Sequence, residues 1–371
     1  MQGERHSKQP ARHWRASTSP YKRIEKYDTT GQGTHKVEMA TRTILVVGAT
    51  GQQGSAVLEA LSDFTSSSPP TTYKPKILAL TRSASSPKAR ALPSKYSNLD
   101  LEVVEGNTRD PDPIFAAHPD ITSVFSYTLP PDEVPQACAL IDAAATTASR
   151  EGSEVHFVFS SVDRGGEPKS WDTPTDVTHF REKHEIELHL RAIAAAATAD
   201  GKKRKNGKKH MTYTILRPVA FMDNLNPTSP FGAAFASLWA TMPRDTKLQL
   251  VSVRDIGRVA ARALLSPDSE RYRDRAIGLA GDELTLLDAR AVYRRVAGLQ
   301  LPQAWGIVGW GIRWAVGDVG AMFRWFERSG YGVDVEKLRA EQEQEEEGGG
   351  MQDLETWLRE SSRFECGRGR K

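Results

Sequence analysis

The sequence predicts an α/β protein built on a doubly wound parallel sheet, with a smaller C-terminal α/β lobe. Between residues 43 and 218, apolar runs recur that are nearly continuous rather than alternating, a pattern typical of strands buried on both faces. Helical segments separate these runs, which indicates parallel strands joined by right-handed crossovers. The first run leads directly into a glycine-rich turn, GATGQQG, as in a Rossmann-type sheet.

Six strands and three helices account for the sheet part of the chain. The predicted strands are 43–47, 76–82, 101–106, 123–128, 155–161 and 213–218. The predicted helices are 55–64, 131–148 and 177–199. The first of these helices places Val57, Ala60, Leu61 and Phe64 on one face, which is the period expected of a helix that packs on a sheet.

Beyond residue 218 the hydrophobic period changes, and this indicates the smaller lobe. Short strands at 248–253 and 276–281 alternate with helices at 255–265 and 286–297. The apolar segment Ala304–Phe326 is interrupted by glycines and charges, so we expect it to form helices that pack on the domain. Its tryptophans are expected to pack within these helices or to line a pocket: Trp305, Trp310, Trp314 and Trp325.

Composition divides the chain into a folded part and polar flanks. Residues 1–38 are polar and have no structural period, which fits a disordered extension, a transit peptide or a start site at Met39. Of these hypotheses we favour a disordered or artefactual extension. Residues 39–340 form the predicted domain. Its parts and the segments that follow it are the sheet core (43–218), the lobe (mainly 219–340), an acidic low-complexity insertion (341–350) and a C-terminal helix with a tail (351–371).

The charge distribution excludes several classes of partner. The net charge is +3, but residues 202–209, KKRKNGKK, carry six positive charges and no negative ones, so the rest of the chain is acidic overall. This argues against a direct nucleic-acid partner, because such a protein clusters basic residues over its fold. No apolar run approaches the roughly 20 residues of a spanning helix, so we expect no membrane partner.

Cysteine usage and the basic loop bear on the compartment. Cys138 and Cys366 are far apart, and Cys366 lies in a polar tail, so we expect a reducing compartment rather than a disulfide framework. KKRKNGKK resembles a nuclear import signal, although a solvated loop is the simpler interpretation. We therefore expect a cytoplasmic protein, with a nuclear location as the alternative. The sequence does not indicate the oligomeric state.

The glycines of the turn each have a separate part in binding a dinucleotide. Gly48 lets the chain turn sharply off the strand, and Gly51 lets the backbone approach a pyrophosphate with no Cβ in the way. Gly54 lets the helix pack close to the sheet. The helix N-terminus then directs free N–H groups toward the phosphates. Because this turn follows a strand and opens an amphipathic helix, its context favours a dinucleotide site.

The end of the second strand favours NADP over NAD. An NAD site places an acidic residue there, to bind the ribose 2′-hydroxyl. Here the strand ends Leu80-Thr81-Arg82-Ser83, with no acid. An arginine at this point is suited to a 2′-phosphate, which it binds through a bidentate fork.

Taken together, the motifs of the chain resemble the NmrA-like family of atypical short-chain dehydrogenase/reductases, especially its fungal members. The resemblance covers Thr43 to about Arg359. The motifs that carry it are GATGQQG (48–54), TRS (81–83), VVEGN (103–107), VFSYT (124–128), FSSVDRGG (159–166), HFREKHEIE (179–187), LRPVAFMDNL (216–225), DIGRVA (255–260) and GYGVDVEKLR (330–339). The acidic stretch at 341–350 and the basic loop at 202–209 depart from the family pattern, as insertions.

The resemblance implies an NADP(H)-binding domain and suggests its contacts. It places the 2′-phosphate at Arg82, the adenine near Asn107 and Thr108, and the middle of the cofactor near Thr128. It places the nicotinamide ribose at Lys183 and the nicotinamide beside the backbone of residues Pro218 to Phe221. The pyrophosphate contacts would come from the turn formed by Thr50, Gly51, Gln52, Gln53, Gly54 and Ser55, and Gly48 completes the cofactor-binding set by turning the chain off the strand.

The catalytic residues of the wider family are only partly present. Ordinary short-chain dehydrogenases carry a Tyr four residues before a Lys, so that both side chains face the cofactor from one helical turn. Here Lys183 is present, Ser160 and Ser161 end the fifth strand, and position 179 is His rather than Tyr. His179 either serves as an acid or base, since its ordinary pKa lies near neutrality, or caps and packs the helix without chemistry.

No metal site is predicted. His184 and His189 are five residues apart, a spacing that separates them around a helix, unlike the i, i+4 pair of a zinc protease.

Two functions from different classes fit the sequence. The first is an NADPH-dependent oxidoreductase acting on a small carbonyl, imine or activated alkene, with Lys183 or His179 as the catalytic residue. The second is a redox sensor without turnover, whose two cofactor forms change its binding of a regulatory protein such as a transcription factor. The replacement of Tyr by His179 favours the sensor, whereas the retained Lys183 is compatible with the enzyme. Of the two hypotheses we favour the oxidoreductase, and the sensor is the alternative.

Overall fold

The computed structural model describes residues 42–67, 74–199, 210–226, 229–298, 300–301, 306–343 and 350–362. Within Thr41–Lys371 the chain forms one compact unit. The predictions for residues 1–38, for the basic loop at 202–209, for Trp305 and for Cys366 lie outside the described residues, as does most of the acidic insertion.

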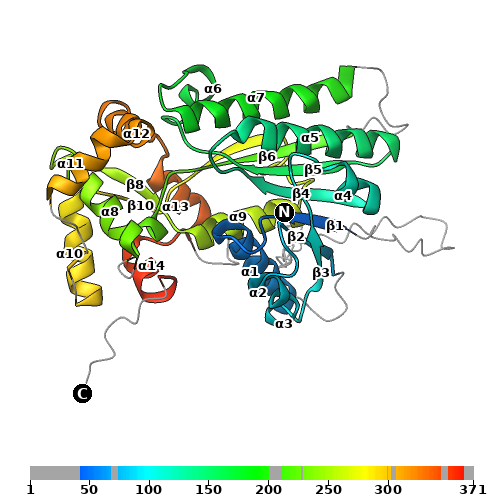
Figure 1. The fold of residues 1–371 in the computed structure, drawn as a ribbon, viewed down its shortest axis with the longest axis horizontal. Helices are drawn as coiled ribbons and strands as arrows, with labels where there is room; N and C mark the ends of the chain where they lie inside the picture. The colour runs from blue at the N-terminus through cyan, green and yellow to red at the C-terminus, as the bar shows by residue number, and fades with distance from the viewer. Residues whose placement is uncertain are drawn as a thin grey trace, which may run out of the picture. The chain divides into compact units, whose positions relative to one another are not determined.

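A seven-stranded sheet with every neighbouring pair parallel forms the centre of this unit (Figure 1). Its strand order is β3-β2-β1-β4-β5-β6-β9. The strands are β1 (Thr43–Val47), β2 (Lys76–Thr81), β3 (Asp100–Glu105), β4 (Ile121–Tyr127), β5 (Val155–Ser160), β6 (Met211–Pro218) and β9 (Arg275–Leu279). The order reverses between β1 and β4, which is the switch point where Rossmann-type sheets bind ligands. The predicted fold class is confirmed.

Helices cover both faces of the sheet (Figure 1). On one face lie α5 (Glu133–Arg150) and α7 (Thr178–Ala199), which bury Leu140, Ile141 and Leu190 against the strands. On the other face lie α1 (Gln52–Ser67) and α9 (Val253–Leu265), which pack against each other. Short helices complete this part of the fold: α2 (Pro87–Arg90), α3 (Leu92–Lys95), α4 (Asp112–Ala117) and α6 (Lys169–Asp172).

The smaller lobe has its own three-stranded sheet and its own apolar core. The sheet order is β10-β8-β7, with β7 at Ala220–Phe221, β8 at Leu248–Val251 and β10 at Asp282–Leu284. The core gathers large aromatic side chains, among them Trp239, Phe323 and Trp357. The lobe helices are η1 (Met222–Leu225), α8 (Pro230–Trp239), α10 (Leu286–Ala297), α11 (Gly306–Ala315), α12 (Gly317–Arg328), α13 (Val335–Glu343) and α14 (Leu354–Glu360).

The structure differs from the sequence-based expectation at two places beyond residue 218. The strand expected at 276–281 within the lobe is β9, which pairs with β6 at the edge of the main sheet. A short apolar run gives no indication of which sheet it joins. Trp310 and Trp314 were expected to pack or to line a pocket, but their exposed fractions are 59% and 89%. Only Trp325 of the described tryptophans in this segment is buried.

A backbone clasp joins the turn after β5 to the segment that follows α12. The carboxylate of Asp163 accepts hydrogen bonds from the backbone N–H groups of Gly165 (3.0 Å), Gly166 (3.2 Å) and Gly332 (2.8 Å). The two glycine segments are in direct contact, because a Cβ added at Gly332 would lie 2.5 Å from the nitrogen of Gly166. The motifs DRGG and GYG, far apart in sequence, therefore form one structural unit.

No helix in the described ranges is long and apolar enough to cross a membrane.

We expect Gly332→Ala to lower the free energy of unfolding by about 2 kcal/mol, because the new methyl group would press against backbone atoms that cannot rotate away. Gly311→Ala is the matched control, since a Cβ there meets nothing within 4 Å and alanine favours helix by up to about 1 kcal/mol. Urea unfolding of both variants measures the difference. Equal stabilities for the two variants would contradict the clasp.

Candidate functional site

The glycine turn at the end of β1 has a backbone geometry and close contacts that favour glycine. Gly48 has φ +62°, in the left-handed region. A Cβ at Gly54 would lie 2.7 Å from the carbonyl carbon of Gly48, so the first turn of α1 packs directly against the loop. The backbone N–H groups in the first turn of a helix have no partner within that helix. Together these features place the N-terminus of α1, which favours anions, beside the turn at the carboxyl end of β1.

The side chain of Tyr127, which the sequence analysis did not single out, lies against this turn. A Cβ at Gly48 would lie 2.8 Å from the Tyr127 ring, and one at Gly51 would overlap its hydroxyl group. Burial raises the pKa of the Tyr127 phenol, and the charge of Arg82 partly offsets this. The phenol therefore lies beside the glycine turn that is predicted to bind the pyrophosphate. The charge that partly offsets the raised pKa of this phenol belongs to Arg82, the residue predicted to bind the 2′-phosphate.

The remaining residues of the turn have varied surroundings. Gln52 is exposed, and Thr50 is partly buried. Ser55 donates its hydroxyl to the carbonyl of Gln52 (3.1 Å). The side-chain oxygen of Gln53 is buried and has no hydrogen-bond partner among the described residues.

The loop after β2 holds Arg82 in the open. Arg82 is exposed, and the N–H of Ala84 donates to the carboxylate of Glu105 (2.8 Å), which ties this loop to the end of β3. Asn107 follows β3, and its side-chain oxygen accepts from the N–H of Arg109 (3.0 Å). Asn107 also lines a cavity of about 250 Å³ between β3 and α4; Thr108, predicted beside it, is not one of the lining residues.

A buried carboxylate, Glu133, lies at the centre of the predicted catalytic residues. It is the first residue of α5, and its side chain is fully buried. Its Oε1 pairs with Nδ1 of His179. Its Oε2 lies 3.1 Å from Nζ of Lys183 and accepts a 2.5 Å hydrogen bond from the hydroxyl of Thr128. The structure thus brings His179, Lys183 and Thr128 together around a group that the sequence analysis missed.

The charges of Glu133 and Lys183 stabilise each other, whereas burial disfavours the charged form of both groups. Burial alone would raise the pKa of Glu133, but the hydrogen bond from His179 and the charge of Lys183 outweigh it and lower the pKa to about 2. Burial lowers the pKa of Lys183, and the charge and hydrogen bond of Glu133 oppose that lowering. Each ion therefore depends on the other to remain charged in the interior.

The serines at the end of β5 have different surroundings. The hydroxyl of Ser160 is buried without a hydrogen-bond partner among the described residues, and its carbonyl lies 3.5 Å from Nζ of Lys183. Ser161 instead donates to Glu187 (2.5 Å). Glu187 also binds the fully buried Arg164 (2.7 Å), so Ser161 belongs to a structural ion cluster and not to the Lys183 group.

Pro218 and Phe221 lie at the junction between the sheet and the lobe. Pro218 ends β6, and its carbonyl accepts a hydrogen bond from the N–H of Asp163 (3.1 Å). Phe221 lies in β7, is partly buried, and packs against the core that α1 and α9 share. Both residues are therefore near the carboxyl end of β6, where the resemblance places the nicotinamide.

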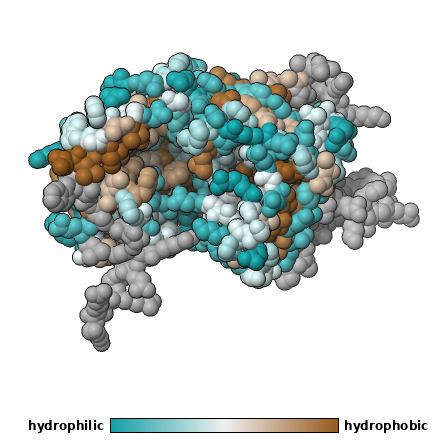
Figure 2. Space-filling view, viewed as in Figure 1, coloured by the Kyte–Doolittle hydropathy of each residue, from teal (hydrophilic) through white to brown (hydrophobic). Residues whose placement is uncertain are grey.

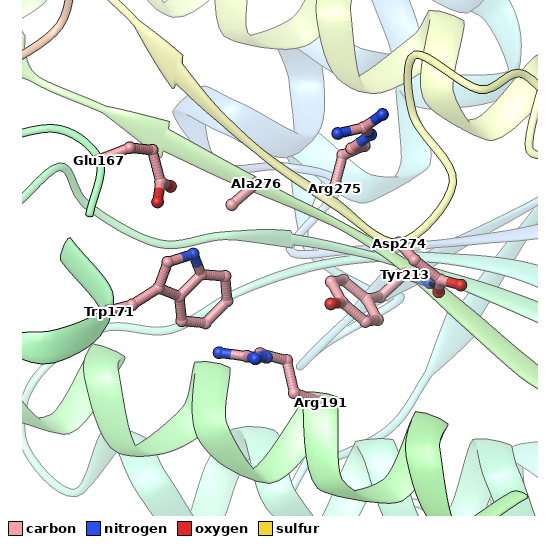
Figure 3. Close-up of a pocket in the computed structure, with 7 residues that line it drawn as sticks. All are labelled: Glu167, Trp171, Arg191, Tyr213, Asp274, Arg275 and Ala276. Atoms are coloured by element: carbon pink, nitrogen blue, oxygen red, sulfur yellow. Dashed lines mark hydrogen bonds between the residues drawn. The ribbon is translucent and has the colours of Figure 1, made fainter.

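A separate cavity of about 400 Å³ lies between α7 and the strands β6 and β9 (Figure 3). It is lined by Glu167, Trp171, Arg191, Tyr213, Asp274, Arg275 and Ala276. The Trp171 ring is contacted by two guanidinium groups, those of Arg191 and Arg217, each 4.1 Å from its centre. None of the residues predicted for the cofactor lines this cavity.

A family model described as the NmrA-like family matches residues 40–358. The chain belongs to the NmrA-like family. Among curated proteins, none matches it.

Solved structures share the fold at low sequence identity. One is the negative transcriptional regulator NmrA in complex with NADP: 17% identity, 88% of this chain and 97% of that chain, TM-score 0.58. A second is the NADPH-dependent quinone oxidoreductase QOR2 from Escherichia coli in complex with NADPH. Its sequence identity is 19%, the match covers 85% of this chain and 97% of that chain, and the TM-score is 0.57. A third is the triphenylmethane reductase of Citrobacter sp. in complex with NADP(H). Its sequence identity is 15%, the match covers 85% of this chain and 98% of that chain, and the TM-score is 0.54. The family's fold is therefore shared by a regulator and by reductases.

We expect the charge on Glu133 to stabilise the fold above its unfolded pKa. Since its folded pKa of about 2 lies below the ordinary value of 4.5, this stabilisation is complete above pH 4.5 and is lost as the pH falls toward 2. Its size is roughly 3 kcal/mol. Urea unfolding between pH 2 and pH 6 should therefore show a shallower acid loss in Glu133→Gln than in the wild type.

Asp255 provides a control of opposite sign. Burial raises its pKa to about 6, so its contribution to stability is lost as the pH rises through 6. Asp255→Asn should therefore make the gain of stability between pH 4 and pH 6 steeper. If the pH dependence of the free energy of unfolding changed in the same direction in Glu133→Gln and Asp255→Asn, the opposite pKa shifts assigned to the two residues would be contradicted.

Proposed function

We propose that the protein binds NADP(H) and works as an oxidoreductase on a small carbonyl, imine or activated alkene. The observation that carries the proposal is the meeting of His179, Lys183 and Thr128 at the buried Glu133. Burying an ion pair is costly and is commonly found where a site needs perturbed proton affinities. In this fold, ligands bind at the carboxyl ends of the strands, where this cluster lies.

The residues present fit the cofactor on two structural grounds. The first is the glycine turn, in which the left-handed φ of Gly48 and the close backbone contact at Gly54 bring the N-terminus of α1 to the end of β1. The second is a pair of buried polar atoms, the side-chain oxygen of Gln53 and the hydroxyl of Ser160, that have no partner among the described residues. Arg82 is exposed and thus open to the 2′-phosphate, and Lys183 would hold the nicotinamide ribose.

When bound, the reduced cofactor supplies a hydride. The protein supplies a position for the substrate and a proton. His179 has its Nδ1 engaged by Glu133 while its side chain keeps 32% of its surface exposed, so its ring is open to solvent and to a small ligand. Lys183 is the second candidate donor. Its ammonium group bonds Thr128 (3.1 Å) as well as Glu133, which makes it the better suited of the two to hold a ribose in place.

A surface feature supports the alternative function, a sensor that regulates a protein partner. Helix α11 exposes Ile307, Trp310 and Trp314, with 76%, 59% and 89% of their surface accessible. Figure 2 shows a hydrophobic band in this part of the lobe surface. Exposed apolar clusters of this kind are typical of protein–protein contacts. With two cysteines in the chain, a reducing compartment, cytoplasmic or nuclear, fits either function.

We expect Arg82→Ala to weaken NADPH binding about 10- to 100-fold, because a charged hydrogen bond to the 2′-phosphate is lost. NADH, which has no 2′-phosphate, should bind as before. Arg90→Ala, which removes another exposed arginine from the neighbouring helix α2, is the matched control. Titration calorimetry measures all three proteins. Preference for NADH in the wild type would contradict the assignment.

Turnover separates the enzyme from the sensor. The loss of NADPH absorbance is followed with 1,4-naphthoquinone, cyclohexenone and a cyclic imine as trial substrates. For an enzyme we expect turnover with at least one substrate, reduced 100-fold or more in Lys183→Ala. For a sensor we expect no turnover with any of them, together with unequal affinities for NADPH and NADP.

A further inference from the structure

We propose that Glu133 is a positioning residue that fixes His179 in the tautomer with hydrogen on Nδ1, so that Nε2 is the nitrogen that exchanges a proton with the substrate. The proposal rests on the proposed oxidoreductase function and goes beyond it by naming the atom that transfers the proton. It assigns a function to a residue that no sequence motif indicated.

The division of contacts between the two carboxylate oxygens supports this assignment. Oε1 faces His179, whereas Oε2 receives both Lys183 and the hydroxyl of Thr128. Lys183 also donates to Thr128, so these two residues and Oε2 form a closed triangle of contacts. With Oε2 occupied in this way, Oε1 has a fixed direction, and the imidazole ring must align with it.

The protonation state of Glu133 decides which nitrogen of His179 carries hydrogen. With a pKa of about 2, Glu133 is ionised at neutral pH and can only accept hydrogen bonds. Nδ1 must therefore be the donor in that contact. Among the described residues, Nε2 has no hydrogen-bond partner. This is the arrangement in which an orienting carboxylate leaves the second ring nitrogen for acid–base chemistry.

The backbone holds the carboxylate at the required place. Glu133 begins α5 directly after Asp132, which adopts a left-handed φ of 59°. The N–H of Glu133 donates to the side chain of Glu182 (3.0 Å), one residue before Lys183 on α7. Helix α5 is therefore tied to α7 both through the backbone of Glu133 and through its side chain.

The proton balance of the reaction follows from this geometry. In the reduction of a ketone, the bound cofactor would supply the hydride to the carbonyl carbon as the C=O π bond breaks, and the oxygen would accept the Nε2 proton of a His179 that carries hydrogen on both ring nitrogens. The alcohol, the oxidised cofactor and a neutral His179 with its Nδ1 hydrogen still directed at Glu133 would remain. Solvent then returns a proton to Nε2, since a third of the side chain is exposed.

The tautomer of His179 tests the proposal without any cofactor or substrate. In the full chain labelled with ¹⁵N at histidine, long-range ¹H–¹⁵N spectra at alkaline pH distinguish the two neutral forms, and His179→Gln assigns the signal. We expect hydrogen on Nδ1 in the wild type, whereas free histidine in water favours hydrogen on Nε2. An Nε2–H form in the wild type would overturn the proposal by itself, whatever the Glu133 variants show.

Two variants then link the tautomer to Glu133. In Glu133→Ala we expect the His179 signal to move to the form of free histidine. In the matched control Glu182→Gln, which removes a neighbouring carboxylate but keeps an acceptor for the N–H of Glu133, we expect the wild-type form. An unchanged tautomer in Glu133→Ala, with a native circular dichroism spectrum, would show that Glu133 does not set it.

Binding and turnover measurements separate this inference from the proposed function. If calorimetry detects no NADPH binding, the proposed function fails whatever the tautomer of His179. If NADPH binds and 1,4-naphthoquinone is reduced, we expect His179→Gln to lower kcat 100-fold or more with little change in the Kd of NADPH. Full kcat in His179→Gln would overturn the proton-transfer part of the inference alone.

Discussion

The interior of this protein is organised around a carboxylate that must stay charged without water. Glu133 is held by Lys183, His179 and Thr128, which come from two different elements of the sheet domain. Losing one partner of such a group leaves an uncompensated ion, which typically costs 3–5 kcal/mol. The start of α5, the end of β4 and the rotation of α7 are therefore fixed relative to one another. A second buried ion cluster, Glu187 with Arg164 and Arg217, anchors the same helix two turns from His179.

The fold could be predicted from sequence because its signals are local. The buried strands are continuous apolar runs, and Gly48 and Gly54 by themselves indicate a sharp turn followed by a helix packed close to the strand. Lys183 and His179 could be paired because they lie one helical turn apart. Strand β9 could not be placed, since a short apolar run is compatible with either sheet until its partner β6 is known.

The centre of the candidate site could not be predicted, because its members meet only in three dimensions. Glu133 lies in the polar stretch PPDEVP, which in sequence looks like a solvated helix start, and nothing local shows that it is buried. The contact of Tyr127 with the glycine turn depends on β4 lying beside β1. The exposure of Trp314 was equally hidden, since helical spacing shows which residues share a face but not whether that face is covered.

The path of the chain through the two sheets has a consequence for how the protein is made. Strand β6, helix α9 and strand β9 form a crossover unit of the main sheet into which β7, η1, α8 and β8 are inserted. The lobe is therefore assembled from chain segments between β6 and α9 and after β9. On the ribosome, the main sheet has all its strands once Leu279 has emerged. Trp239 and Phe235, already synthesised by then, belong to a core that lacks Phe323 and Trp357 until these residues follow. For about eighty further residues of translation, the nascent chain therefore carries an incomplete aromatic core, the kind of surface that chaperones bind.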